Sequence, residues 1–240
     1  MYRYAIPFPT APGKTESDIR SIAASNSAHP AEYLESRRRL GVTLERAYVQ
    51  ATPMGIATIA YLESDRDFAS SILLLTGSDL EFDRRFLDMV AAVHGVDMRQ
   101  PPPGPPPETV GSWNDPSVTD RRRGLAFIAP LLPGKVDATS AFSRHAYHER
   151  AEELAESRRA LGVTVEVITL NSNPMGDFVC AYIEGADPVD ANRRFASSTR
   201  SYDLWFRGRL KELFPPEVDF DRPVPPVAEV FDSLAVHATA

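Results

Sequence analysis

The sequence predicts an α+β fold made of two tandem copies of one β-α-β-β-α-β unit. Three pairs of matching segments support the duplication, and each pair lies 121 residues apart. The pairs are AIPFPTAPGK from Ala5 and AFIAPLLPGK from Ala126, ESRRRLGVTLE from Glu35 and ESRRALGVTVE from Glu156, and the PMG triplets around Met54 and Met175. A constant offset over three segments is typical of a repeat rather than of shared composition. We therefore expect one repeat over residues 1–120 and the other over residues 121–240.

Each repeat is expected to begin with a strand, at Tyr4–Phe8 and Leu125–Ala129, that ends in Pro-x-x-Pro-Gly-Lys. This turn leads into a helix, and Thr15 with Asp18 has the spacing of a capping box at the start of the first copy. Both helices are expected to end at a Leu-Gly pair, Leu40-Gly41 and Leu161-Gly162, where glycine can adopt the left-handed cap. His29-Pro30 predicts a break inside the first copy only.

Two strands should follow in each repeat, joined by a tight turn around the PMG triplet because Pro and Gly favour such turns. A second helical region comes next, with a break predicted at Ser78 and Ser201. Short final strands complete each unit. The strand ranges are Thr43–Gln50, Ile56–Glu63 and Glu108–Trp113 in the first copy, and Thr164–Asn171, Phe178–Glu184 and Ala228–Ser233 in the second.

The segment PPPGPPP at residues 101–107 can form neither a helix nor a central strand, because proline lacks the backbone N–H and fixes φ. We expect a stiff, extended connector on the surface.

Composition excludes several classes of protein. A net charge of −7 and a pI near 5.3 argue against nucleic acid as a partner, since a phosphate backbone favours clustered Lys and Arg. No apolar run approaches the length of a membrane span. Cys180 is the only cysteine, which rules out an intrachain disulfide and fits a reducing cytoplasm.

The repeat resembles the dimeric α/β-barrel superfamily, on the Pro-Gly-Lys that opens helix one and the Tyr-x-Glu at Tyr61–Glu63 that ends the third strand. The ESRRxLGVT segment and SDLEFDRRF at residues 78–86 are similar to an uncharacterised group of small bacterial proteins in that superfamily. The resemblance implies two ferredoxin-like halves that form a pseudo-dimeric α/β barrel within one chain. It leaves open whether two chains pair further into a homodimer.

Members of the superfamily include cofactor-independent monooxygenases, polyketide cyclases, lactone isomerases and haem-degrading enzymes, so the fold does not fix an activity. The resemblance implies a protein that binds a small apolar or anionic molecule. Its chemistry would be cofactor-independent proton transfer on an enolisable or aromatic substrate. The alternative is a binding or interaction module without enzymatic activity. Haem binding is a weaker option, because only His148 is placed to face a cavity.

The helix before Gly162 supplies the candidate catalytic residues. At 100° per residue, Arg144, Tyr147, His148 and Arg158 share the face that should pack on the sheet. We expect His148 to move protons, because its ordinary pKa is near 6.5, and Arg158 to bind a substrate oxygen. The expected substrate-binding residues are Arg144, Tyr147, Asn171, Tyr182 and Trp205.

A structural role is the alternative for Arg158 and for Arg37, its counterpart in the first repeat. A buried guanidinium needs an anionic partner. Glu45 or Glu63 could supply one in the first repeat, and Glu166 or Glu184 in the second.

A metal site is a further alternative, because His145, His148 and Glu152 lie at i, i+3 and i+7 on one helix. One helix rarely surrounds a metal alone, so we expect no metal site and no cofactor. Cys180 lies in an apolar strand and is expected to be a buried, unreactive thiol.

Overall fold

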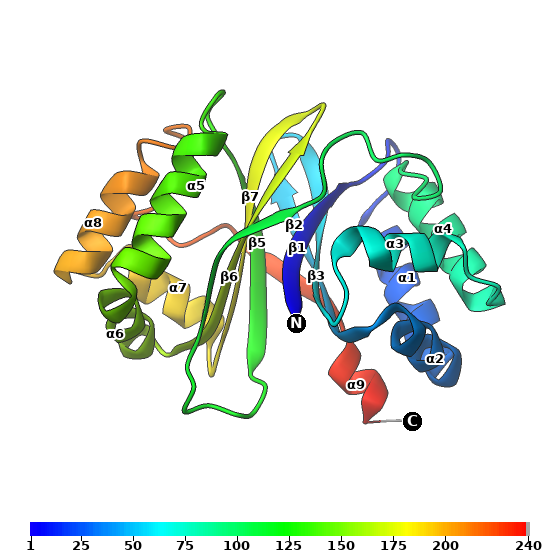
Figure 1. The fold of residues 1–240 in the computed structure, drawn as a ribbon. Helices are drawn as coiled ribbons and strands as arrows, with labels where there is room; N and C mark the ends of the chain where they lie inside the picture. The colour runs from blue at the N-terminus through cyan, green and yellow to red at the C-terminus, as the bar shows by residue number, and fades with distance from the viewer. Residues whose placement is uncertain (239–240) are drawn as a thin grey trace. The chain divides into compact units, whose positions relative to one another are not determined.

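The computed structural model describes residues 1–238, which divide into two compact units. Unit one comprises Met1–Pro106 and the segment from Val227 onward, and unit two comprises Pro107–Pro226. Each unit holds one four-stranded antiparallel sheet (Figure 1). The expected α+β class and the twice-repeated β-α-β-β-α-β order are confirmed.

In unit one the strand order is β1-β3-β2-β8, and helices α1 to α4 lie on one face of this sheet (Figure 1). The elements are β1 (Tyr2–Pro9), α1 (Glu16–Ala28), α2 (Pro30–Leu40), β2 (Val42–Thr52), β3 (Gly55–Ser64), α3 (Phe68–Thr76), α4 (Glu81–His94), β8 (Val227–Asp232) and α9 (Ser233–His237).

In unit two the strand order is β4-β6-β7-β5, again with the helices on one face (Figure 1). The elements are β4 (Glu108–Asn114), β5 (Arg123–Pro130), α5 (Val136–Arg144), the π-helical turn η1 (His145–Glu149), α6 (Ala151–Leu161), β6 (Val163–Asn173), β7 (Gly176–Gly185), α7 (Pro188–Ala196) and α8 (Ser201–Leu210).

The compact units do not coincide with the sequence repeats expected over residues 1–120 and 121–240. The fourth strand of the first repeat, β4, pairs with β6 in unit two, and the fourth strand of the second repeat, β8, pairs with β2 in unit one. A proline-rich stretch precedes each of these strands, at residues 101–107 and 215–226. The first of these stretches has no helix or strand and is mostly exposed, as expected for an extended connector.

The helix ends form as the sequence predicts. Thr15 and Asp18 make the capping box of α1. Gly41 and Gly162 end α2 and α6 with φ of 74° and 81°, which is the left-handed conformation that glycine adopts at little cost. Pro30 separates α1 from α2, since its ring cannot follow a helical turn.

The helix before Gly162 is not continuous, and this corrects the expected face of that helix. The π turn η1 and the non-helical Arg150, with φ −114° and ψ 31°, interrupt it. A π turn holds more residues than an α turn, so it changes the direction of every side chain beyond it. Spacing at 100° therefore does not carry over from Arg144 to Arg158. Across residues 1–238, no helix is long and apolar enough to span a bilayer.

Candidate functional site

A buried ion pair lies between helix and sheet in each unit. The Arg37 Nε donates to Glu45 at 2.6 Å, and the Arg158 Nε donates to Glu166 at 2.7 Å. All four side chains are nearly covered, with Arg37 and Arg158 6% and 2% exposed. The predicted pairing of each arginine with a glutamate is confirmed, and the partners are Glu45 and Glu166.

Further groups surround the unit-one pair. The Arg37 Nη1 donates to the Ser36 hydroxyl, which donates to Asp83 at 2.5 Å, and the Tyr33 hydroxyl donates to Glu45 at 3.0 Å. Burial alone would lower the pKa of Arg37, but the charges of Glu45, Tyr33 and Asp83 and the hydrogen bond to Glu45 together outweigh it, and the net shift is upward. Burial, and then the charge of Glu45, raise the pKa of Tyr33 well above its usual value. Arg37 is therefore a permanent cation and Tyr33 a neutral donor.

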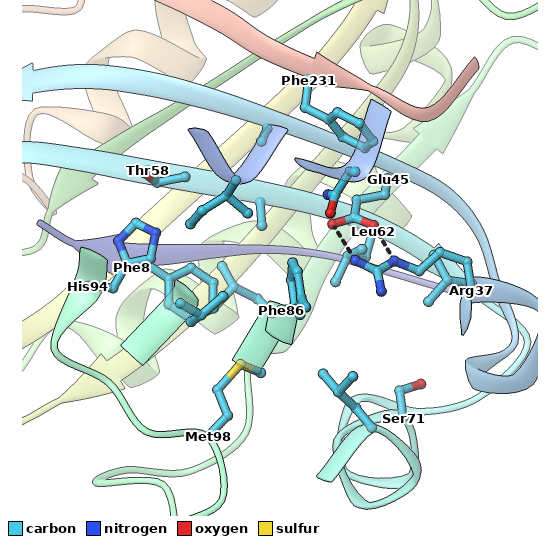
Figure 2. A pocket seen from close by; sticks show the side chains of 18 of the residues that line it. Phe8, Arg37, Glu45, Thr58, Leu62, Ser71, Phe86, His94, Met98 and Phe231 are labelled. Carbon is cyan, nitrogen blue, oxygen red and sulfur yellow. Dashed lines mark hydrogen bonds and ion pairs between the residues drawn. The ribbon is translucent and has the colours of Figure 1, made fainter. Parts of the chain in front are cut away.

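Unit one contains a chamber of about 120 Å³ between its sheet and helices α1 to α4 (Figure 2). An engineered apolar cavity of about 150 Å³ is large enough to hold benzene, so the volume suits a small ring. Most of the wall is apolar. The aromatic and sulfur-bearing members are Tyr4, Phe8, Phe68, Phe86, Met98 and Phe231.

Two groups of polar lining residues lie apart in this first-unit chamber, Arg37 with Glu45 and Thr58 with His94 (Figure 2). Glu45 pairs in register with Leu62 of β3, so the ion pair lies four residues along that strand from Thr58. Four residues at about 3.3 Å each separate the two levels by roughly 13 Å. Phe8 of β1 is the register partner of Thr58, and Pro9 is the next residue. His94 bonds Pro9, so it lies at the Thr58 end of the chamber.

The Tyr4 and Thr58 hydroxyls, which line the chamber, are buried without a partner within the described residues, and the lining residue Asn26 is buried as well. The Asn26 side chain is 3% exposed. Leaving a buried polar group unpaired costs about 1–3 kcal/mol. Such groups are what a ligand-binding wall contains before the ligand arrives.

His94 is held with one ring nitrogen open. Its Nδ1 lies 2.9 Å from the Pro9 carbonyl oxygen, which can only accept, so Nδ1 carries the hydrogen. Burial lowers the pKa of His94 below its ordinary 6.5, although the bond to Pro9 opposes this shift. The ring is therefore neutral at pH 7, and Nε2 keeps a free lone pair. A neutral histidine lining an apolar chamber is suited to accept a proton.

The corresponding place in unit two is filled by large side chains. Tyr147, which aligns with Asn26, lies against Gly111 on β4. In unit one the Ala11 N–H donates to the Val93 carbonyl, and in unit two the aligned Leu132 N–H donates to the Leu213 carbonyl. The residues that follow these two carbonyls are therefore equivalent, and Phe214 takes the place of His94. The aromatic core members there are Trp113, Phe142, Tyr147, Phe195, Tyr202, Trp205, Phe206, Phe214 and Phe220.

The structure does not bring the residues predicted for unit two into one site. His148 and Arg144 are exposed, whereas Arg158 is buried against Glu166, so their expected common face is wrong. The π turn described above is the physical reason.

The five predicted substrate-binding residues are likewise dispersed. Tyr147 and Trp205 belong to the packed core, and the Arg150 guanidinium lies 3.9 Å from the Trp205 ring centroid. Leu170 on β6 and Val179 on β7 face that core. Because side chains alternate between the two faces along a strand, Asn171 and Tyr182 lie on the opposite face of the sheet. The Tyr182 hydroxyl donates to Glu184 at 2.6 Å.

One sequence signal for the unit-one site is the histidine at the end of α4. His94 precedes Gly95 at a helix end, and a histidine there is explained equally well by capping. Only the fold shows that its ring turns toward Pro9 and lines the chamber.

Other candidate chemistry finds no support. Within residues 1–238, no group of His, Cys, Asp and Glu side chains is arranged to hold a metal ion. The His145 Nδ1 instead lies 2.7 Å from Glu149. Cys180 is fully buried, and burial raises the pKa of its thiol, which keeps it protonated and unreactive as expected.

Comparisons with known proteins bear on the fold. No protein-family model and no curated protein matches the sequence. Three solved structures resemble the chain over 95% of its length. A putative monooxygenase from Fusobacterium nucleatum has a TM-score of 0.51, 10% identity and 91% of its own chain covered.

The other two structures are more distant in shape. One is an anthrone oxidase-like protein, with a TM-score of 0.48, 12% identity and 88% of its chain covered. The other is a putative monooxygenase from Lactobacillus acidophilus, with a TM-score of 0.49, 10% identity and 92% of its chain covered. At these identities, the likeness to the F. nucleatum structure shows the fold alone. The chain thus has a fold of two tandem ferredoxin-like units, each with a four-stranded antiparallel sheet.

Proposed function

We propose that the first-unit chamber binds a small, mostly apolar molecule and that His94 removes a proton from it without a cofactor. The observation that carries this proposal is the open Nε2 of a neutral, buried histidine in an apolar wall. Unit two, with Phe214 in the place of His94, would then serve as scaffold.

The chemistry follows from the orientation of the ring. Nε2 takes the proton from an acidic C–H or O–H group, and the electron pair of that bond stays on the substrate as an enolate or phenolate. Nδ1–H keeps its bond to the Pro9 carbonyl, which stabilises the imidazolium that forms. Return of the proton to the same or another atom restores the neutral histidine.

A test needs a probe with an acidic C–H group that fits the chamber, and cyclopentanone, a single ring with one carbonyl, is suitable. Its exchange of α-hydrogen for deuterium in D₂O is followed by proton NMR, and the buffer rate is subtracted. General base catalysis contributes about 10²–10⁴-fold, so His94→Phe should abolish most of the protein-catalysed exchange. Phenylalanine already occupies this place in unit two, so the variant should fold.

Two further variants complete the experiment. His148→Ala, at the exposed residue first predicted to be catalytic, should exchange as fast as the unmodified protein. Ala60→Phe should close the chamber and stop exchange. Equal exchange by His94→Phe and the unmodified protein would overturn the proposal.

A binding role without catalysis is the second candidate. Among the described lining residues the only carboxylate is Glu45, and Arg37 and Tyr33 already bond it. No lining carboxylate is therefore free to assist His94. Binding of cyclopentanone by the unmodified protein, lost in Ala60→Phe but without accelerated exchange, would support this role.

A further inference from the structure

We infer that the ligand of the first-unit chamber is uncharged, with a hydroxyl or carbonyl head that bonds the Asn26 amide and a flat apolar body. This inference rests on the proposed binding function and adds the chemical class of the ligand. A small anion, which the superfamily resemblance left open, is thereby excluded.

Asn26 is the first argument. Its amide can both donate and accept, and the side chain lines the chamber and is buried. A ligand hydroxyl or carbonyl would form a neutral hydrogen bond with it. Unit two has Tyr147 at the aligned position, so a buried amide is not a requirement of the fold.

Arg37 is the second argument, because it is the one cation among the described lining residues that could attract an anion at pH 7. Glu45 and the Ser36 hydroxyl accept its hydrogen bonds. The rings of Tyr33 and Phe86 cover its guanidinium, with centroids at 4.8 Å and 4.6 Å. A ligand carboxylate would have to displace Glu45 from a buried ion pair in order to reach it.

The charged groups around Arg37 also disfavour an anionic ligand. The carboxyl groups of Glu45 and Asp83 both lie near Arg37, and each is buried. Two carboxylates and one guanidinium leave this end of the chamber net negative, which repels an anion. A cation is disfavoured too, because Arg37 already pairs with Glu45, the one lining carboxylate.

The walls define the body of the ligand. Phe8, Phe68 and Phe86 contribute aromatic surface and Met98 a thioether, and both kinds of group pack well against flat rings. The cavity volume of about 120 Å³ suits one ring with a small substituent.

The experiment compares four probes that share one ring and one methyl group: toluene, 4-methylphenol, 4-methylbenzoate and 4-methylbenzylammonium. Dissociation constants are measured by ligand-observed NMR with the full chain. We expect toluene and 4-methylphenol to bind, with the phenol about three- to tenfold tighter because of one added neutral hydrogen bond. We expect both charged probes to bind at least about a hundredfold more weakly than the phenol, because a buried charge without a partner is costly.

Asn26→Leu tests the head group. The variant should bind toluene within about twofold of the unmodified protein and lose the preference for 4-methylphenol. Because toluene is measured on the same variant, a folding defect would show as lost toluene binding, and Asn26→Ala then provides a second, smaller replacement.

The outcomes separate this inference from the proposed function. Binding of 4-methylbenzoate or 4-methylbenzylammonium as tightly as 4-methylphenol would overturn the inference alone. A preference for the phenol that survives in both Asn26 variants would also overturn it. Failure of all four probes to bind the unmodified protein would overturn the proposed function itself.

Discussion

The ring of Tyr147 lies against the backbone of Gly111, so closely that a Cβ added to this glycine would be 2.6 Å from the ring. In unit one the matching strand position holds Phe231, which pairs in register with Ala47 as Gly111 pairs with Ile168. In unit two the large residue, Tyr147, is on the helical segment and the small one, Gly111, is on the strand. In unit one the smaller residue, Asn26, is on the helix and the large one, Phe231, is on the strand. This reversal helps to leave a chamber in one unit and a filled core in the other.

The close approach of Tyr147 makes Gly111→Ala a sharp test of the filled core. An added methyl group must displace the Tyr147 ring in a packed interior, which costs about 1–3 kcal/mol. Urea denaturation should show this loss. Gly208 on α8 is the matched control, because a Cβ there meets no atom within 4 Å. Gly208→Ala should instead gain up to about 1 kcal/mol of helix propensity. Equal effects at the two glycines would contradict the packing described.

Thr58→Val should stabilise the unliganded protein by about 1 kcal/mol, because it removes a buried hydroxyl that has no partner. Valine is nearly isosteric, and Val179 occupies the aligned position in unit two. The reverse change, Val179→Thr, should lower the free energy of unfolding by about 1–3 kcal/mol. A loss of stability in Thr58→Val, measured by thermal and urea unfolding, would show that its hydroxyl is bonded after all.

The Arg158–Glu166 pair can be examined without involving the chamber. Arg158→Met should cost about 3–5 kcal/mol, because it leaves Glu166 buried without its cation. Adding Glu166→Leu should recover most of the loss, since apolar side chains of similar size replace the whole pair. A double-mutant cycle in urea measures the coupling. If the two losses simply add, the residues do not act as a pair.

His94 should make stability depend on pH. Its pKa is lowered in the folded protein by burial, so acidification protonates it first in the unfolded chain. The stability it contributes is present above pH 6.5 and falls as the pH drops from 6.5 toward the lowered pKa. Melting temperatures from pH 8 to 5 should therefore fall more steeply for the unmodified protein than for His94→Phe. Parallel curves would be evidence that His94 is equally easy to protonate in both states.

Much of the fold was predictable because its signals are local. The repeat offset, the capping box at Thr15 and the glycine caps at Gly41 and Gly162 depend on residues a few positions apart. The pairing of Arg37 and Arg158 with glutamates followed from the cost of burying a lone charge. These arguments need no knowledge of distant segments.

The location of the site was not predictable in the same way. The π turn at His145–Glu149 changes the direction of the side chains that follow it, and the segment contains no proline or glycine from which the turn could be predicted. Whether a chamber forms depends on pairs such as Asn26 with Phe231 and Tyr147 with Gly111, and strand register must bring these together. The sequence predicts Tyr147 as a ligand contact, but the volume of its side chain fills the place that a ligand would need.

The pairing of β8 with β2 also determines when each unit can be completed during synthesis. Arg46 and Asp232 form an ion pair at 3.0 Å across 186 residues of chain, whereas unit two is one continuous segment. Unit two therefore has all of its strands once residue 226 has left the ribosome, while the sheet of unit one still lacks its last strand. Val230 and Phe231, which line the chamber, are supplied by that strand. Contacts of such long range are slow to form, so the capacity to bind a ligand should appear last in folding and mark its completion.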